Sequence, residues 1–368
     1  MRNGPFNAPS VVYNSRCAQE DDDGMPTYEW EIALSSVVSH GGSSNANSDA
    51  LGVTEFDPTS SFLATGGIAR KIRVYDMRSL LPPNREGVTF LDHNHAGGNR
   101  YIFTPAKLSS LKWKPDSCGR VIGSGDYDGV VMEYDLQTGV PIFERDEHGG
   151  RRVWSLDYSS STHLGASGSD DGSMQLWDAR CQEGGNVAVI WPSRSPCSIC
   201  SVEFEPEDGY MVAVGCADKR GYLYDTRMVK EPVMVLEGHR RTVTYVKFLE
   251  RTKVVTSSVD EQLKLWDVER GTGSVRTFSG HVNSKNFVGL SVWRNGGLLV
   301  SGSENNQVYV YDRRWGTPIW VHAGVNPEAI VSSVAWSQVH RDQCVLAAGA
   351  SDGSLQIFTG FRTSASGN

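Results

Sequence analysis

The sequence predicts an all-β fold, a seven-bladed β-propeller whose ring is closed by an N-terminal strand. Seven short apolar stretches each end in an aromatic residue, and an aspartate follows in six of them. The aromatics stand at positions 75, 134, 177, 224, 266, 311 and 358, so the successive intervals are 59, 43, 47, 42, 45 and 47 residues. A period of about 40–45 residues is typical of propeller blades. A second apolar segment with an Asp/Gly turn precedes several stretches, as at Gly165–Gly172, so each unit should read strand, tight turn, strand.

The fifth unit carries the fullest polar pattern. His239 precedes the strand TVTYVKF, and Ser257 or Ser258, Asp260 and Trp266 follow it. In WD repeats, a His, Ser, Asp and Trp in this order bond in series and hold the turn to the strand, because buried polar groups need partners. A catalytic role for His239 with Asp260 is the weaker interpretation, since a structural network explains the spacing without a substrate.

Length and charge favour a single domain with a protein partner. The chain has 368 residues, which could form two or three domains, but a repeat array is one cooperative body. A net charge of −8 provides no basic field for nucleic acid or an anionic membrane. The sequence shows neither a secretory leader nor an apolar run long enough to span a bilayer. We therefore expect a soluble protein that binds no nucleic acid and no membrane.

The cysteines indicate reduced thiols. Seven cysteines are scattered along the chain, which suits the cytosol or nucleus. Cys197 and Cys200 form a CxxC pair that invites a metal or redox interpretation. A zinc site normally needs four ligands, no second CxxC occurs, and strand alternation sends positions three apart to opposite faces. The sequence therefore predicts no metal site and no cofactor.

The two ends of the chain are expected to share the last blade. Residues 1–27 are polar and acidic and are predicted to be a disordered extension. After Phe358 too few residues remain for a fourth strand, whereas 28–38 alternate between apolar and polar residues. The predicted propeller spans 28–361, with 28–38 as the closing strand and 362–368 as a tail. Closure removes the exposed edges of an open array.

The irregular stretches lie near the start of the chain. Residues 39–49 are predicted to be a flexible connection to the first blade. Leu80–Gly87 and His93–Pro105 lengthen the first interval to 59 residues. We expect both to be surface loops that are available to a partner.

One rim of the central channel is the candidate binding site. It is formed by residues at the start of each first strand and by the turns between second and third strands. Three cations and three aromatics fall there: Lys107, Tyr127, Arg152, Trp154, Arg241 and Phe287. Such residues suit an extended peptide with acidic and apolar side chains, and Trp, Tyr and Arg dominate binding hot spots. The alternative is that Trp154 packs between blades and that the cations are only solvated.

Several long segments are far more specific than the repeat pattern. They are KLSSLKW (107–113), GDYDGVVMEYD (125–135), EHGGRRVWSLDY (147–158), SGSDDGSMQLWD (167–178), GHRRTVTYVKFL (238–249) and SGHVNSKNFVGL (279–290). With them the chain, from about Val53 to Phe358, resembles the WD-repeat domain of the plant constitutively photomorphogenic ubiquitin ligase. In that ligase the rim holds valine-proline peptides of photoreceptors and transcription factors. The resemblance implies that the same six rim residues bind such peptides here. At Ser284 the ligase pattern has glutamate, so ligand preference is expected to differ.

The ligase also carries a RING finger and a coiled coil, and neither pattern occurs in this sequence. A propeller of this length without them resembles the plant repressors of UV-B photomorphogenesis. This resemblance implies a nuclear and cytoplasmic protein that binds the UV-B photoreceptor at its core and at its C-terminal valine-proline tail. It would promote return of the photoreceptor to the inactive homodimer and so repress UV-B signalling. The ligase itself and light-signalling transcription factors are further partners that the resemblance suggests.

A second function is suggested by Trp177, Asp178 and Arg180. Together they are similar to the WDxR box by which some propellers dock on the adaptor of cullin-RING ubiquitin ligases. Asp225 with Arg227 repeats the pattern in part. The alternative function is therefore a substrate receptor of a cullin-RING ligase that acts on light-signalling transcription factors. The competing explanation is ordinary turn chemistry, since exposed arginines commonly pair locally.

A propeller enzyme is the third hypothesis, and the sequence argues against it. No metal-ligand cluster and no GxSxG elbow occur. The glycine-rich segment Gly123–Gly129 lacks the helix that a phosphate-binding loop must open. We therefore predict no catalytic residues.

Overall fold

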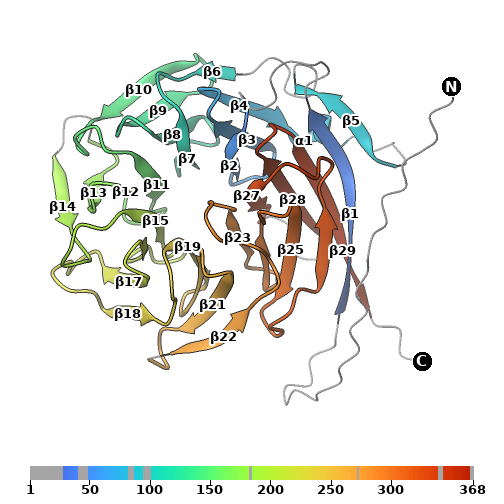
Figure 1. The fold of residues 1–368 in the computed structure, drawn as a ribbon. Helices are drawn as coiled ribbons and strands as arrows, with labels where there is room; N and C mark the ends of the chain where they lie inside the picture. The colour runs from blue at the N-terminus through green and yellow to red at the C-terminus, as the bar shows by residue number, and fades with distance from the viewer. Residues whose placement is uncertain are drawn as a thin grey trace.

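The computed structural model describes residues 28–39, 49–81, 87–93, 101–181, 185–271, 273–338 and 343–364. These residues form seven β-sheets arranged as a ring around a central channel (Figure 1). The predicted all-β, seven-bladed propeller is confirmed. Residues 1–27, which the sequence predicts to be disordered, and most of the predicted connection 39–49 lie outside the described ranges.

Each of the first six blades is a four-stranded sheet, and its first strand lies nearest the central channel. Blade 1 contains β2 (Leu51–Phe56), β3 (Phe62–Gly67), β4 (Lys71–Asp76) and β6 (Tyr101–Phe103); blade 2 contains β7 (Leu108–Trp113), β8 (Val121–Asp126), β9 (Val131–Asp135) and β10 (Val140–Arg145); blade 3 contains β11 (Val153–Tyr158), β12 (Leu164–Ser169), β13 (Met174–Asp178) and β14 (Asn186–Ile190). Blade 4 contains β15 (Ile199–Phe204), β16 (Met211–Cys216), β17 (Arg220–Asp225) and β18 (Met234–Glu237); blade 5 contains β19 (Val243–Glu250), β20 (Lys253–Ser258), β21 (Gln262–Asp267) and β22 (Ser274–Phe278); blade 6 contains β23 (Leu290–Trp293), β24 (Leu298–Ser301), β25 (Gln307–Asp312) and β26 (Trp320–Ala323). Within the described ranges the helix α1 (Met77–Leu80) has four residues, and no helix there is long and apolar enough to span a membrane.

The aromatic residues that set the sequence period are core residues. Tyr75, Tyr134, Trp177, Tyr224, Trp266, Tyr311 and Phe358 are each at most 2 % exposed. Burial of one such side chain contributes about 1.5–3 kcal/mol. They pack between neighbouring blades, as Trp177 of blade 3 does within the cluster that contains Val131 of blade 2. The repeated pattern is therefore scaffold.

The polar network predicted for blade 5 is present. His239 Nδ1 lies 3.0 Å from Asp260 Oδ2, and His239 Nε2 lies 2.7 Å from Thr256 Oγ1. Trp266 Nε1 donates to the same hydroxyl at 2.8 Å. The series therefore links the turn, the loop before β19 and the third strand, which is a structural role for His239 and Asp260.

The hydroxyl in this network belongs to Thr256, so the prediction of Ser257 or Ser258 was wrong. Side chains alternate along β20, and Ser257 pairs with Leu263 on the face opposite Trp266. Ser258 Oγ donates instead to a backbone carbonyl before β19, at 3.2 Å.

Blade 7 is closed by the N-terminal strand, as predicted. β27 (Val331–Trp336), β28 (Gln343–Ala350) and β29 (Leu355–Ser364) are followed in the sheet by β1 (Tyr28–Ser39), which runs antiparallel to β29 (Figure 1). The predicted boundary at 361/362 was wrong, because β29 continues through Ser364. The last residues of β29 pair with the first residues of β1, which gives this polar segment strand partners.

The interval between β4 and β7 contains two strands, β5 (Thr89–Asp92) and β6, that the sequence analysis did not predict. β5 adds to the outside of β1 in parallel, and β6 forms the outer strand of blade 1. The prediction for His93–Pro105 was therefore wrong, since this stretch contains β6 and begins with a buried histidine. Tyr101 and Phe103 of β6 remain exposed, which concealed the strand in the sequence.

His93 links the first and last blades. Its Nδ1 lies 2.8 Å from the Tyr75 hydroxyl in blade 1, and its Nε2 lies 2.9 Å from the Gly353 carbonyl in blade 7. His93 is only 5 % exposed, so both contacts are shielded from water. The junction of the two chain ends is thus secured by β1, β5 and this histidine.

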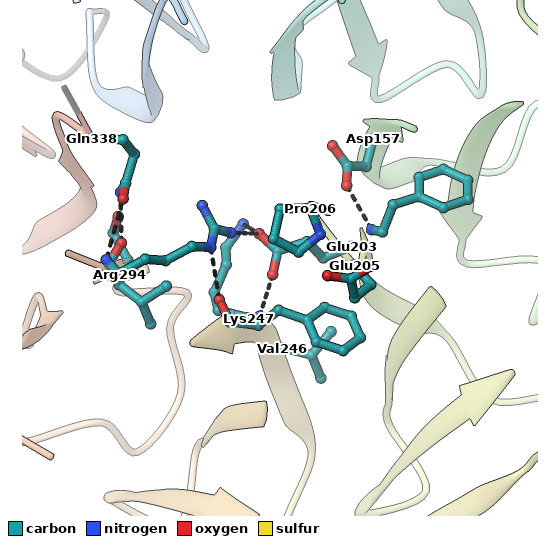
Figure 2. A network of polar contacts seen from close by, with 12 residues as sticks. Asp157, Glu203, Glu205, Pro206, Val246, Lys247, Arg294 and Gln338 are labelled. Carbon is teal, nitrogen blue, oxygen red and sulfur yellow. Dashed lines mark hydrogen bonds and ion pairs between the residues drawn. The ribbon is translucent and has the colours of Figure 1, made fainter. Parts of the chain in front are cut away.

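A belt of charges lies at the opposite end of the channel from the predicted rim. It comprises one side chain from each of blades 1–6, on or just after the inner strand: Glu55, Lys112, Asp157, Glu203, Lys247 and Arg294. Glu203 accepts from Lys247 and Arg294, each at 3.3 Å, and Arg294 also bonds the backbone of blade 5 (Figure 2). Burial alone would raise the pKa of Glu203, but these cations lower it below its usual value. The belt therefore joins blades through paired charges, of which Asp157 and Glu203 are buried and the others are partly exposed.

Removal of residues 28–38 should lower the melting temperature and cause aggregation. The deletion exposes β29 as a free edge and removes Ile32, Val37 and Val38, which are at most 8 % exposed. At about 2 kcal/mol for each side chain, we expect a loss on the order of 10 °C in calorimetry. A deletion limited to residues 1–20 is the control. An unchanged thermal midpoint after loss of 28–38 would show that β1 is dispensable.

Stability should fall in mild acid through His281. This side chain is 2 % exposed, and burial lowers its pKa to about 4, although Asp260 opposes the shift. In the unfolded chain the pKa of His281 is about 6.5, so this histidine causes no loss of stability above that pH. As the pH falls toward 4, the unfolded chain binds the proton first, and the free energy of unfolding decreases by about 2–3 kcal/mol. Urea unfolding at pH 7.5 and 4.5 measures the difference in the free energy of unfolding between the two pH values. This difference should be smaller in His281→Gln. Equal pH dependence in both proteins would exclude His281 as the cause.

Candidate functional site

Four aromatic rings line the mouth of the central channel. A cavity of about 510 Å³ runs along the channel from these four rings, Tyr127, Trp154, Tyr245 and Phe287, to the charge belt, where Glu55, Lys112, Asp157 and Lys247 also line it. Three of these aromatics are among the predicted rim residues. Tyr245 was missed, because in the sequence it is one more apolar residue of the strand TVTYVKF. The rings come from blades 2, 3 and 5 and from the connection between blades 5 and 6.

Trp154 occupies the centre of this aromatic cluster. The β11–β12 register shifts between Val153 and Ser155, so Trp154 is the extra residue of a β-bulge. Bulges redirect a side chain out of the regular alternation. The Trp154 ring stacks on Phe287, with centroids 4.5 Å apart and planes 11° apart, and its Nε1 donates to Asp170 Oδ1 at 2.5 Å.

Arg152 extends the cluster with a positive charge. Its guanidinium carbon lies 4.0 Å from the ring centroid of Tyr127 and 4.4 Å from that of Trp154. Such cation–π contacts contribute about 0.5–2 kcal/mol each. Arg152 Nε is buried and finds no acceptor among the described residues. The Arg152 side chain as a whole is partly exposed, so its positive charge can attract a ligand carboxylate.

The other two predicted cations lie on either side of the cluster. Lys107 is exposed, and its carbonyl accepts from the Tyr127 amide at 3.0 Å, which places it beside that ring. Arg241 is also exposed, and its Nη1 donates to the Ser284 carbonyl at 3.0 Å. The structure thus brings Tyr127, Arg152, Trp154 and Phe287 into direct contact. Arg241 instead contacts the segment that leads to Phe287.

The Phe287 segment is held by an acid that the sequence analysis missed. Glu304 accepts from the Ser284 hydroxyl and from the amides of Lys285 and Asn286, each at 2.8 Å. Partial burial would raise the pKa of Glu304, but these donors outweigh it and hold the pKa at about 2. Ser284, where the ligase pattern has glutamate, is therefore a donor to a carboxylate.

The channel mouth combines apolar and positively charged surface. Flat apolar surface lies beside Arg152 and Lys107, which matches a ligand with apolar and acidic groups. Among the described residues no group of three or more His, Cys, Asp or Glu could hold a metal ion. Cys200 is buried on β15, and burial raises the pKa of its thiol to about 12.

The predicted adaptor-docking residues lie at the other end of blade 3. Trp177 is 1 % exposed, whereas Arg180 projects outward and donates to both oxygens of Asp178, at 2.9 and 2.6 Å. Arg227 with Asp225, and Arg314 with Asp312, repeat the same two bonds. The Asp178–Arg180 pair alone therefore does not distinguish blade 3 from blades 4 and 6. Arg180 also borders a cavity of about 470 Å³ together with Ile142 and Phe143.

Comparison with known proteins identifies the family. A family described as "Nucleolar protein 10-like, N-terminal domain", a β-propeller, matches residues 151–311. The chain is 54 % identical to WD repeat-containing protein RUP1 of Arabidopsis thaliana, over 92 % of this chain and 87 % of that protein. It is 56 % identical to WD repeat-containing protein RUP2 of the same plant, over 86 % of this chain and 89 % of that protein. E3 ubiquitin-protein ligase COP1 of Arabidopsis thaliana is 33 % identical, over 82 % of this chain but only 43 % of the ligase. The chain therefore belongs to the family of WD-repeat proteins that contains RUP1 and RUP2.

Proposed function

We propose that this protein is a non-catalytic regulatory propeller that binds valine-proline peptides at the channel mouth. The observation that carries the proposal is the Trp154–Phe287 stack with the Arg152 guanidinium beside it, over a cavity of about 510 Å³. Stacked rings offer flat apolar surface for a Val-Pro pair. Arg152 and Lys107 supply the charge that attracts acidic flanking residues. Aromatic and arginine side chains also provide most of the energy in binding hot spots.

The partner that we propose is the UV-B photoreceptor, bound at its valine-proline tail and at its core. This step rests on the resemblance to the plant repressors of UV-B photomorphogenesis and on family membership. Occupying the tail would displace a competing ubiquitin ligase with a similar rim. Orienting two photoreceptor monomers would raise their effective concentration and speed return to the inactive homodimer. The protein would thereby repress UV-B signalling in the nucleus and cytoplasm.

The substrate-receptor alternative has weaker support. The Asp178–Arg180 geometry recurs in blades 4 and 6, so only the neighbouring cavity favours blade 3. A pull-down of the cullin-RING adaptor with wild type and Arg180→Ala separates this alternative from peptide binding, because Arg180 is remote from the channel mouth.

A valine-proline peptide with acidic flanks should bind wild type and lose affinity in rim variants. Trp154→Ala removes the central ring and should cost about 2 kcal/mol or more, roughly a thirtyfold rise in Kd. Lys107→Ala should cost less, because the side chain is exposed and screened. Isothermal titration measures each Kd. Trp191→Ala, which removes an exposed tryptophan outside the cavity lining, is the matched control. Absence of binding by wild type, or equal binding by Trp154→Ala, would reject the groove.

The chain should also accelerate homodimer formation by UV-monomerised photoreceptor. Substoichiometric wild type should shorten the recovery time, which size-exclusion chromatography follows directly. Trp154→Ala should slow recovery about tenfold at limiting concentration, because fewer complexes form. Recovery that proceeds equally fast without the chain would contradict the proposed regulatory step.

A further inference from the structure

One position of the repeat forms the same backbone hydrogen bond in every blade. It is the residue just after the second strand, and its amide donates to a carbonyl of the connection that leads into the first strand. The seven residues at this position are Ile68, Tyr127, Asp170, Ala217, Val259, Glu304 and Ser351. The hydrogen bond is common to all seven blades, so differences in side chain at this position are not required by the fold.

Two of the seven residues are acids, and each holds one ring of the stacked pair. Asp170 in blade 3 accepts from the indole Nε1 of Trp154 at 2.5 Å. Glu304 in blade 6 accepts from the segment that ends at Phe287. The two acids, which lie in different blades, therefore fix the positions of the two residues whose rings stack.

Glu304 forms an unusually complete set of bonds with this segment. In addition to the Ser284 hydroxyl and the amides of Lys285 and Asn286, it accepts from Asn286 Nδ2 at 3.0 Å. Arg241 donates to the Ser284 carbonyl at 3.0 Å. Bonds to a charged acceptor are stronger than neutral ones, so the segment is fixed from two directions.

The structural network of the repeat does not explain these acids. In blades 3 and 5 the histidine before the first strand pairs with the next residue of the turn, Asp171 or Asp260. In blade 6 the next residue is Asn305, and His281 bonds the Tyr311 hydroxyl instead. Asp170 and Glu304 thus serve the rim.

We propose that Asp170 and Glu304 are positioning residues of the rim site, which hold Trp154 and Phe287 in the stacked geometry that receives ligand. This inference rests on the proposed peptide binding. A positioning role explains why two acids lie at a site that is proposed to bind an acidic ligand. Asp170 Oδ1 and both oxygens of Glu304 accept from internal donors, while Arg152 is partly exposed and offers its positive charge to the ligand. A site held before binding loses less conformational entropy when the ligand arrives.

The test compares alanine variants with variants that keep an acceptor oxygen. Glu304→Ala should speed amide hydrogen exchange in a peptide spanning residues 279–290 and raise the Kd for a valine-proline peptide about tenfold or more. Glu304→Gln keeps an acceptor and should stay within about threefold of wild type in both measurements. Asp170→Ala should shift the Trp154 indole resonance, assigned with Trp154→Phe, and weaken binding similarly, whereas Asp170→Asn should restore most of it. Glu328→Ala removes an exposed acid from a nearby connection and is the control.

Exchange and the indole resonance are measured without peptide, which separates this inference from the proposed function. If wild type binds no peptide, the proposed function fails. Faster exchange or a shifted indole resonance in the alanine variants would still show that the two acids position the rim residues. The inference is overturned if both alanine variants keep wild-type exchange and indole shift, or if they loosen the rim without changing the Kd of a peptide that wild type binds. If an alanine variant fails to fold, the Gln or Asn variant is used instead. A Gln or Asn variant that binds the peptide as weakly as Trp154→Ala would also contradict the inference.

Discussion

Ring closure is the constraint on which the rest of the structure depends. The antiparallel pairing of β1 with β29 completes blade 7, and β5 from the blade 1 interval then covers part of β1. His93 adds hydrogen bonds to both blades at the junction. A closed ring fixes the distance across the channel, so Trp154 of blade 3 can stack on Phe287, which lies more than a hundred residues later in the chain. An open array would leave this pair without a defined separation.

The same repeat unit carries both scaffold and site, at different positions. The strand-ending aromatics and the His239 network are buried and hold blades together. The residues that open toward the channel mouth differ from blade to blade, and there the chain places aromatics, cations and two carboxylates with internal donors. The proposed function therefore depends on side chains that differ between the repeats. The paired charges of the belt at the other end of the channel contribute to joining the blades (Figure 2).

Periodic features were predictable from the sequence, and unique contacts were not. The period and the need for a closing strand predicted the seven-bladed ring, and strand order placed Tyr127, Trp154 and Phe287 near one another. Spacing could not distinguish Thr256 from its neighbouring serines, because that choice depends on strand register. Nor could it reveal β5, whose partner is a strand fifty residues away in the sequence. Glu304 was missed because its donors lie about twenty residues earlier in the chain, in the connection that leads into β23.

The most direct test of the central claim is a crystal structure of the chain with a bound valine-proline peptide. The account predicts the Val-Pro pair against Trp154 and Phe287 at the channel mouth, an acidic group of the peptide near the Arg152 guanidinium, and Asp170 and Glu304 still bonded to their internal donors. A peptide lying along the outer edge of a blade, or at the charge-belt end of the channel, would contradict it.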